Sequence, residues 1–482
     1  MKKLQRVLCI VMVVLFAAQI FTSCSKGESD DVNITNTSKN DQTTLEKNNN
    51  DFDDDLGEFN FNGYEFTIYE WVNDDWIDSR LDYEEITADV YRDSVYMRNR
   101  YLEDRFNIEI KSVSFTDPTT MGILIASGAT DYDLYVTRNP EMLDYACEGF
   151  VNPISDLVHI NLDKAYWDSF MTEQLTITNK KFFAVGAFDF TSLDFAYVMI
   201  VNKLLLQDYG IENPFELVKN GKWTMDKFAE MCKVGTVDLD GDQMMKEKDA
   251  WGFVARGNDV LPAFWIGAGV HAAEKDGDDI PQNTMGTERF INVVDKIFDI
   301  TWRNESYYDT FPLTMFLEGN VLFNDCTFYR LKNLRAMEVD FSILPYPKFD
   351  ETQEKYYSRV PNLSLFATPR IDSTENLART SVILEAMACE SLRTCVPAYY
   401  NLVLKTKLAR DVDSEEIIDY TTANRVVDFV DSFMTIELRD TELRNMFISK
   451  NNTLVSLNES TMAGIFDTRR DKIVKAFSEL DN

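Results

Sequence analysis

From Tyr64 onward, short segments typical of β-strands alternate with longer segments of helical periodicity. Tyr64–Tyr69 is predicted as a strand, and so are Asn107–Val113 and Asp133–Thr137. Between the first two, Thr87–Asn107 repeats apolar residues every three or four positions, with charges between them, as an amphipathic helix does. Strands separated by helices of this length predict an α/β fold with mostly parallel sheets and helices packed outside them. Further helices are predicted over Thr224–Lys233, Thr287–Arg303, Glu375–Leu392, Ser414–Asp431 and Thr461–Leu480.

The composition excludes several classes of function. The 482 residues are 45% hydrophobic, and at about 150 residues per domain they hold two or three domains with real cores. Asp and Glu number 81 against 48 Lys and Arg, a net charge of −33 that repels phosphate backbones and argues against nucleic acid as a partner. The two histidines, His159 and His271, argue against a multi-histidine metal centre.

The N-terminal sequence is predicted to be a secretion signal. Three basic residues in Met1–Arg6 precede the apolar run Val7–Ala18, whose length of about 12 residues falls short of the roughly 20 that span a bilayer. The run ends in Phe21-Thr-Ser-Cys24, which resembles the lipobox of bacterial lipoproteins, with Phe21 where leucine is usual. The resemblance implies that residues 1–23 are removed and that Cys24 is lipidated, anchoring the protein to the outer face of the cell membrane. An ordinary secretory signal with an incidental cysteine is the alternative.

The segment after Cys24 is predicted to be a disordered tether. Ser25–Asp55 is rich in Ser, Thr, Asn, Asp, Lys and Glu, and it has almost none of the large apolar residues whose burial offsets the entropy of ordering. We therefore assign residues 24–57 to the tether. The remaining cysteines have scattered spacing and are predicted to be buried thiols without disulfides; they are Cys147, Cys232, Cys326, Cys389 and Cys395.

Four later stretches, taken in order, resemble one family of binding proteins. They are Ile200–Pro214, with its Asn202-Lys203 and Gly210-Ile-Glu-Asn-Pro214 elements, Gly221–Asp226, Phe316–Phe323 and Asp340–Pro347. Behind a lipoprotein signal, this order resembles the extracellular solute-binding proteins of ABC importers, of the maltose-binding-protein-like kind. Each stretch alone is a weak signal, and the order of all four over most of the chain makes the resemblance specific.

The resemblance implies a two-lobed fold in which each lobe is a mostly parallel sheet flanked by helices, with ligand in the cleft between the lobes. We expect lobe 1 at 58–190 plus 350–398, and lobe 2 at 191–349 plus 399–482. The chain is expected to cross between the lobes near Asp189–Phe195, Pro345–Val360 and Tyr399–Leu404. Hinge closure around a ligand would convert binding into a change of shape.

The candidate ligand-binding residues are aromatic or polar groups at the expected cleft. Aromatic rings stack on the C–H faces of sugars, and planar polar groups bind sugar hydroxyls. The candidates are Trp71 and Trp76 after the first strand, Arg138 after the Asp133–Thr137 strand, Asp189 at the first crossing, and Trp265 from the other lobe. For each aromatic residue a place in the core is the alternative, and Arg138 could instead form a cap or a surface ion pair.

The stretch Asp238–Asp249 resembles a calcium-binding loop of the EF-hand type. Asp238, Asp240 and Asp242 stand at positions 1, 3 and 5, Met244 offers a backbone carbonyl at position 7, and Asp249 stands at position 12. Two features depart from that pattern: the glycine is at position 4 and the last acid is aspartate. A solvated acidic turn is the alternative. A bound calcium would be structural, and we expect no catalytic cofactor.

The sequence as a whole predicts a lipid-anchored, extracellular substrate-binding protein of an ABC importer. We expect a monomer that captures a carbohydrate, most readily an oligosaccharide, and passes it to the importer's permease subunits without acting as an enzyme. A surface glycan-binding protein without a transporter is the first alternative, and a secreted glycoside hydrolase is the second. Acid pairs are too frequent among 81 carboxylates to favour the hydrolase.

Overall fold

The computed structural model describes residues 53–73, 80–117, 119–127, 131–311, 313–334, 340–370, 373–400, 404 and 411–479. The described residues all belong to one compact unit, Asn49–Asn482. The predicted signal peptide, Cys24 and Trp76 therefore lie outside the described residues. In the described part, no helix is both long and apolar enough to span a membrane.

The last residues of the predicted tether pack on the folded body. Both guanidinium nitrogens of Arg105 contact the Asp54 carboxylate, and the Lys164 ammonium lies 2.5 Å from Asp55. Leu56 is partly buried against an apolar cluster. Residues 53–57 are thus fixed by ion pairs and a small apolar contact, which the polar composition of the tether did not indicate.

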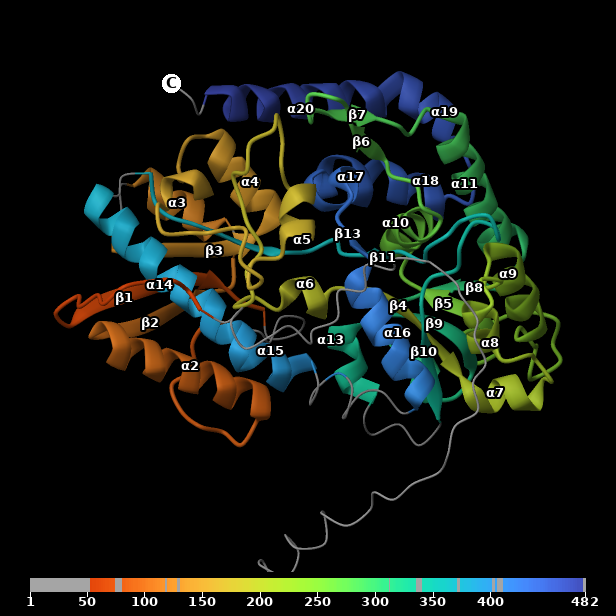
Figure 1. The fold of residues 1–482 in the computed structure, drawn as a ribbon. Helices are drawn as coiled ribbons and strands as arrows, with labels where there is room; N and C mark the ends of the chain where they lie inside the picture. Colours follow the sequence, from red (N-terminus) through yellow and green to blue (C-terminus); the bar gives the residue numbers. More distant parts are fainter. Residues whose placement is uncertain are drawn as a thin grey trace, which may run out of the picture. The chain divides into compact units, whose positions relative to one another are not determined.

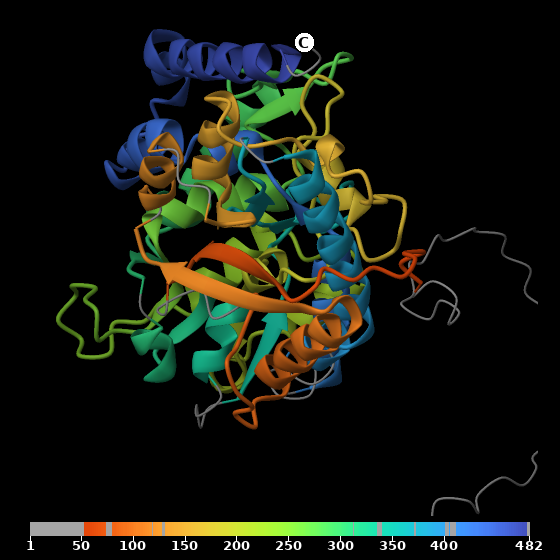
Figure 2. The ribbon, with the colours of Figure 1, turned by 90° about the vertical axis from the view of Figure 1, so that its left-hand side faces the viewer.

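The first sheet has four strands in the order β12-β3-β1-β2. Three strands are parallel, and β12 runs antiparallel to β3. In Figures 1 and 2, α2 and α14 lie together over one face of this sheet, while α3 and α4 lie over the other. The elements are β1 (Tyr64–Trp71), α2 (Val90–Phe106), β2 (Ile108–Phe115), α3 (Thr120–Ala126), β3 (Leu134–Arg138), α4 (Asn139–Cys147), β12 (Ser364–Ala367) and α14 (Thr374–Arg393).

The second sheet has five strands in the order β10-β4-β9-β5-β8 and is mixed. Strand β4 pairs antiparallel with both β10 and β9, whereas β5 pairs parallel with β9 and β8. The strands are β4 (Tyr197–Asn202), β5 (Trp251–Ala255), β8 (Tyr307–Asp309), β9 (Val321–Thr327) and β10 (Phe341–Leu344). The helices around it include α7 (Lys203–Asp208), α8 (Pro214–Lys219), α9 (Met225–Val234), α10 (Gly257–Gly267), α11 (Glu288–Phe298), α12 (Thr314–Leu317), α13 (Phe328–Leu331) and α16 (Val412–Ala423).

Local sequence explains where these elements begin and end. The Asp89 side chain accepts hydrogen bonds from the first backbone amides of α2, and Asn107 ends that helix in the left-handed conformation, with φ of 51°. All six residues of β4 are buried, and its continuous apolar sequence is typical of a central strand. Asn202 then ends β4 and caps α7 through its side-chain oxygen.

Three segments connect the two sheets. Helix α6 (Thr191–Asp194) leads into β4, and the segment from β10 to β12 contains β11 (Ser358–Arg359). These two connections coincide with the crossings expected at Asp189–Phe195 and Pro345–Val360. The third leads from α14 through α15 (Cys395–Pro397) to α16, and part of it lies outside the described residues. The lobe boundaries stay a prediction.

The C-terminal quarter packs on both halves of this arrangement. Strand β13 pairs with β11, and α20 contacts both α4 and β7; in Figures 1 and 2, α20 lies across one end of the body. The elements are β13 (Arg425–Val426), α17 (Phe429–Phe433), the π-helical segment Thr435–Leu443, α18 (Arg444–Ile448), α19 (Leu454–Leu457) and α20 (Ala463–Ser478), with β6 (Ala273–Lys275) and β7 (Pro281–Asn283) forming a small separate hairpin. The five described cysteines are free thiols, as predicted.

A buried ion network secures the second crossing. Arg359 of β11 has no exposed side-chain surface, and its guanidinium lies 2.7 Å from Asp259 of α10 and 2.7 Å from Asp431 of α17. Burial alone would raise the pKa of Asp259, but the charge and hydrogen bond of Arg359, together with the charges of Arg439 and Arg256, outweigh burial and hold the pKa below its ordinary value. The same guanidinium lies over the Tyr197 ring at the start of β4.

Candidate functional site

The carboxyl ends of the strands mark the surface where a ligand is expected. In open α/β sheets, ligands bind outside these ends, because the loops that follow the strands gather there. The parallel strands of the first sheet end at Trp71, Phe115 and Arg138, and in the second sheet β5 and β9 end at Ala255 and Thr327.

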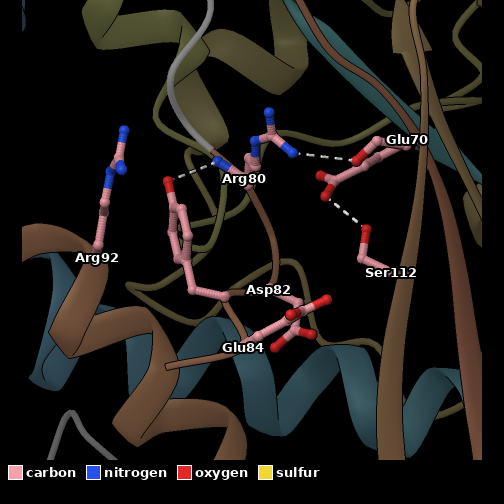
Figure 3. Close-up of a pocket in the computed structure, with 8 residues that line it drawn as sticks. Glu70, Arg80, Asp82, Glu84, Arg92 and Ser112 are labelled. Carbon is pink, nitrogen blue, oxygen red and sulfur yellow. Dashed lines mark hydrogen bonds between the residues drawn. The ribbon is translucent and has the colours of Figure 1, made fainter. Parts of the chain in front are cut away.

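A cavity of about 430 Å³ lies at the carboxyl ends of β1 and β2 (Figure 3). Its lining is almost entirely polar and contains two guanidinium groups and three carboxylates. The lining residues are Glu70, Arg80, Asp82, Tyr83, Glu84, Arg92, Ser112 and Ser114.

Glu70 forms the wall of this cavity. Its side chain is almost completely buried and accepts hydrogen bonds from Ser112 Oγ at 2.5 Å and from the backbone N–H of Leu81 at 3.1 Å; Figure 3 shows the Glu70 carboxylate directed at Ser112. Burial raises the pKa of Glu70, and these hydrogen bonds together with the Arg80 charge oppose the rise. The cavity therefore presents a polar, partly charged surface suited to hydroxyl-rich or ionic ligands.

A chain of aromatic rings connects the cavity to the first crossing. Tyr83 packs edge-on against Tyr91, and the Tyr91 ring lies 5.0 Å from Phe190 and 5.4 Å from Tyr399. The Tyr399 hydroxyl donates to the Asp194 carboxylate at the end of α6. This contact brings the third connection next to the first.

Asp194 is also close to the second sheet, because the Lys332 ammonium lies 3.7 Å from its carboxylate and 5.7 Å from the centre of the Tyr399 ring. Lys332 follows α13 directly. Groups from the crossing, from the third connection and from the carboxyl end of β9 therefore meet at one place.

Asp189, predicted from its place at the crossing, belongs to this region. It is half-buried and accepts hydrogen bonds from the Thr191 amide at 2.9 Å and the Thr191 hydroxyl at 2.7 Å. Burial raises the pKa of Asp189 to about 7, and the charges of Asp194 and Glu70 add to the rise against the Thr191 hydrogen bonds. The charges of two other carboxylates, one at the cavity and one at the crossing, thus act on Asp189.

Trp71 and Arg138, two of the predicted ligand-binding residues, lie against each other as a packed pair. The Arg138 guanidinium lies 5.1 Å from the Trp71 ring and pairs with Glu141. The indole N–H donates to the Thr116 carbonyl at 2.8 Å, and Trp71 is only 4% exposed. Arg138 therefore has accessible surface at this edge, whereas Trp71 acts mainly as its support. Ligand contact by either residue stays a prediction.

Trp265 lies in the core and not at a surface where a ligand could contact it. All residues of α10 are buried, Trp265 is 0% exposed, and its ring packs 5.4 Å from Phe290. The alternative of a core side chain fits these contacts. Because α10 is buried on every side, it offers no face to a ligand. The sequence alone does not indicate whether a tryptophan such as Trp265 lies in the core or at a ligand site.

Three residues that the sequence analysis missed lie at the carboxyl ends of the second sheet. Arg256 follows β5 directly, Phe311 follows β8 and is 50% exposed, and Arg330 lies in α13 after β9. The Arg256 and Arg330 guanidinium carbons lie 5.2 Å and 4.7 Å from the centre of the Phe311 ring. The rule that selected Arg138, an arginine directly after a strand, would also have selected Arg256; no sequence signal indicated Phe311.

The acidic loop gathers three of its five predicted calcium ligands. Carboxylate oxygens of Asp238, Asp240 and Asp242 all lie within 4.8 Å of one another. The Lys246 ammonium lies 3.7 Å from Asp240 and pairs with Asp242, so a cation of the chain itself already neutralises part of this charge.

The other two predicted ligands are differently engaged. Asp249 is buried, and its carboxylate accepts hydrogen bonds from the backbone amides of Leu239 and Lys246 at 3.0 Å and 2.6 Å. The Met244 side chain is 64% exposed, and its amide donates to Asp242. Three carboxylates could thus hold a hard cation, with Asp249 shaping the loop. Calcium binding stays a prediction.

Comparisons with known proteins place the fold. No protein-family model matches the chain, and no curated protein matches it. Among solved structures, a sugar transporter protein of Rhizobium etli in an open conformation is 11% identical, with a TM-score of 0.57 over 86% of this chain and 99% of that one. A cyclo/maltodextrin-binding protein complexed with maltotetraose is 12% identical, with a TM-score of 0.56 over 86% and 97%.

A third neighbour, UgpB of Mycobacterium tuberculosis in complex with glycerophosphocholine, is 12% identical, with a TM-score of 0.52 over 87% of this chain and 96% of that one. Identities this low establish similarity of fold alone. The resemblance inferred from short sequence stretches is confirmed at that level: this chain has the two-lobed α/β fold of maltose-binding-protein-like solute-binding proteins.

Proposed function

We propose that this protein is the substrate-binding component of an ABC importer and that it captures a carbohydrate by closing two lobes around it. The observation that carries the proposal is the arrangement of two α/β sheets, joined by crossing segments, in a fold shared with proteins described as a sugar transporter and as a maltodextrin-binding protein. Polar and aromatic groups meet at the first crossing, where a closing cleft would enclose them. The predicted lobe boundaries belong to this proposal.

The proposal includes a lipid anchor on Cys24, removal of residues 1–23 and an extracellular position on the cell membrane, with the folded body acting as a monomer beside its permease. The basic and apolar N-terminal sequence supports this. Membrane fractionation of cells that express the full chain tests it. The unaltered chain should sediment with membranes, and the Cys24→Ser variant should lack the lipid in intact-mass measurements.

We propose binding without turnover. Importers need a ligand released intact to the permease, whereas a glycoside hydrolase needs two carboxyl groups held at a fixed separation across a bond. The acids near the cavity include Glu70, whose carboxylate already accepts two hydrogen bonds from the protein. Prolonged incubation with each oligosaccharide that binds, followed by chromatography, should return the oligosaccharide unchanged, and a shorter product would favour the hydrolase.

Small-angle X-ray scattering and thermal unfolding of the purified protein together test capture by closure. A panel of neutral and acidic oligosaccharides, from maltotetraose to trigalacturonate, should contain at least one that raises the unfolding temperature and reduces the radius of gyration. A rise in temperature without compaction would contradict closure. No effect from any member of the panel would contradict carbohydrate capture itself.

A further inference from the structure

We infer that the ligand carries an acidic group, which Arg256 and Arg330 bind beside Phe311 at the carboxyl ends of the second sheet. This inference rests on the proposed function and adds to it the charge of the ligand. The structural basis is one juxtaposition: two guanidinium groups flank an exposed aromatic ring where the strands of an α/β sheet end.

Arg256 has unused binding capacity. Its side chain is exposed, and among the described residues its guanidinium forms neither an ion pair nor a hydrogen bond; it lies over the Phe311 ring, and its charge helps to lower the pKa of Asp259. The buried arginines nearby differ, because Arg359 and Arg439 both pair with Asp431. What sets Arg256 apart from the exposed Arg289 is its place directly after a strand of the second sheet, next to a second guanidinium over the same ring.

Arg330 adds a second positive charge that is only loosely neutralised. It donates to the Phe311 carbonyl at 2.6 Å, which fixes the ring's backbone, and its guanidinium lies 3.5 Å from Asp325. Burial raises the pKa of Asp325 to about 6, with the Arg330 charge opposing the rise. Another carboxylate near this site, that of Asp309, accepts a hydrogen bond from the Gly257 amide at 2.8 Å and so faces the start of α10.

The chemistry of these groups favours a carboxylate or another oxyanion on a sugar. A guanidinium presents parallel N–H groups that match a carboxylate or phosphate in two hydrogen bonds, and an aromatic ring beside it holds the guanidinium plane in place. The net charge of −33 repels anions at long range. A local pair of cations would therefore be needed for an acidic ligand, whereas a neutral sugar would not need it.

The test is isothermal titration calorimetry of the purified chain with four probes: trigalacturonate, its fully methyl-esterified form, glucose 6-phosphate and maltotetraose. Acidic probes should bind, and the esterified trimer should bind more weakly. The relative affinity of the uronate and the phosphate ester distinguishes the two sources of the oxyanion. Arg256→Gln and Phe311→Ala should each weaken binding of the acidic probe about tenfold or more, because the charge-assisted hydrogen bonds between the guanidinium and the ligand's acidic group are lost or loosened.

Arg289→Gln is the matched control. Arg289 is also an exposed arginine over a phenylalanine ring, 4.1 Å from the centre of the Phe349 ring, but it lies within α11 instead of directly after a strand of the second sheet. Its variant should bind every probe unchanged, and circular dichroism should show that all variants fold.

The outcomes separate the inference from the function. Binding of maltotetraose or the ester as tightly as the acid overturns the acidic ligand and leaves carbohydrate capture standing. If Arg256→Gln and Phe311→Ala bind the acidic probe as tightly as the wild type does, the assigned site is wrong. Binding of no probe here, and of no member of the wider oligosaccharide panel, overturns both the proposed function and this inference.

Discussion

At the scale of single residues, Asp189 is the carboxyl group that should change its protonation state near neutral pH. Its folded-state pKa of about 7 lies above the ordinary value of 3.8, so the folded protein keeps a proton that the unfolded chain has released between these values. The contribution of this carboxyl group to the free energy of unfolding therefore falls as the pH rises from about 4 to about 7, and it stays constant above about pH 7.

Urea unfolding of the wild type and of Asp189→Asn, at about pH 5 and about pH 8, measures this effect. Other buried acids contribute to both proteins, so the comparison isolates Asp189. The wild type should lose more stability than the variant between the two pH values. Equal losses would mean that Asp189 titrates normally.

At the residue scale, the sequence selects candidates by their place along the chain, but it does not indicate their burial. Arg138 and Asp189 were selected because one follows a predicted strand and the other lies at an expected crossing, and their contact with a ligand stays a prediction. Trp265 was selected for its chemistry, yet every residue of its helix is buried. Phe311 was missed because its exposure depends on the packing of three strand ends that are distant in sequence.

At the scale of elements, the acidic loop gives a prediction about a metal. Calcium should raise the unfolding temperature of the wild type relative to chelator, and Asp240→Ala should abolish that rise, because it removes one of three gathered carboxylates. Lys246→Gln should enlarge the rise, because its ammonium competes for the same oxygens. Equal unfolding temperatures of the wild type in calcium and in chelator would contradict the metal.

The six helices predicted in the sequence analysis are present in the structure with one exception, and that exception has a tertiary cause. The helix predicted over Glu375–Leu392 is α14, and that over Thr224–Lys233 is α9 with Thr224 as its cap. Ser414–Asp431 was predicted as one helix, but the structure ends α16 at Ala423 and restarts a helix at Phe429. Between them, Arg425 and Val426 pair with β11, a contact with a distant segment that local periodicity cannot indicate.

At the scale of the whole molecule, the sequence predicted two α/β sheets and the positions of two crossings, but not the mixed pairing of the second sheet. Antiparallel pairing of β4 with β9 joins segments more than 100 residues apart. Every residue of both strands is buried, the polar Asn324 and Asp325 of β9 included, so their pattern does not indicate the direction or the register of the pair.

The Arg359 network yields a prediction at the same scale, because it joins the second crossing to α10 and α17. Arg359→Met should lower the free energy of unfolding by about 3–5 kcal/mol, since it leaves the carboxylates of Asp259 and Asp431 buried without their main partner. Arg439, 3.4 Å from Asp431, compensates only in part.

The control is Arg303→Met, which breaks ion pairs with Asp295 and Asp299 whose side chains are about half exposed. Such surface pairs are screened by water, and this variant should cost less than about 1 kcal/mol. Urea unfolding with equal dependence on denaturant in all three proteins makes the comparison valid. If Arg359→Met cost no more than Arg303→Met, the crossing would have to be secured by apolar packing instead of by its buried charges.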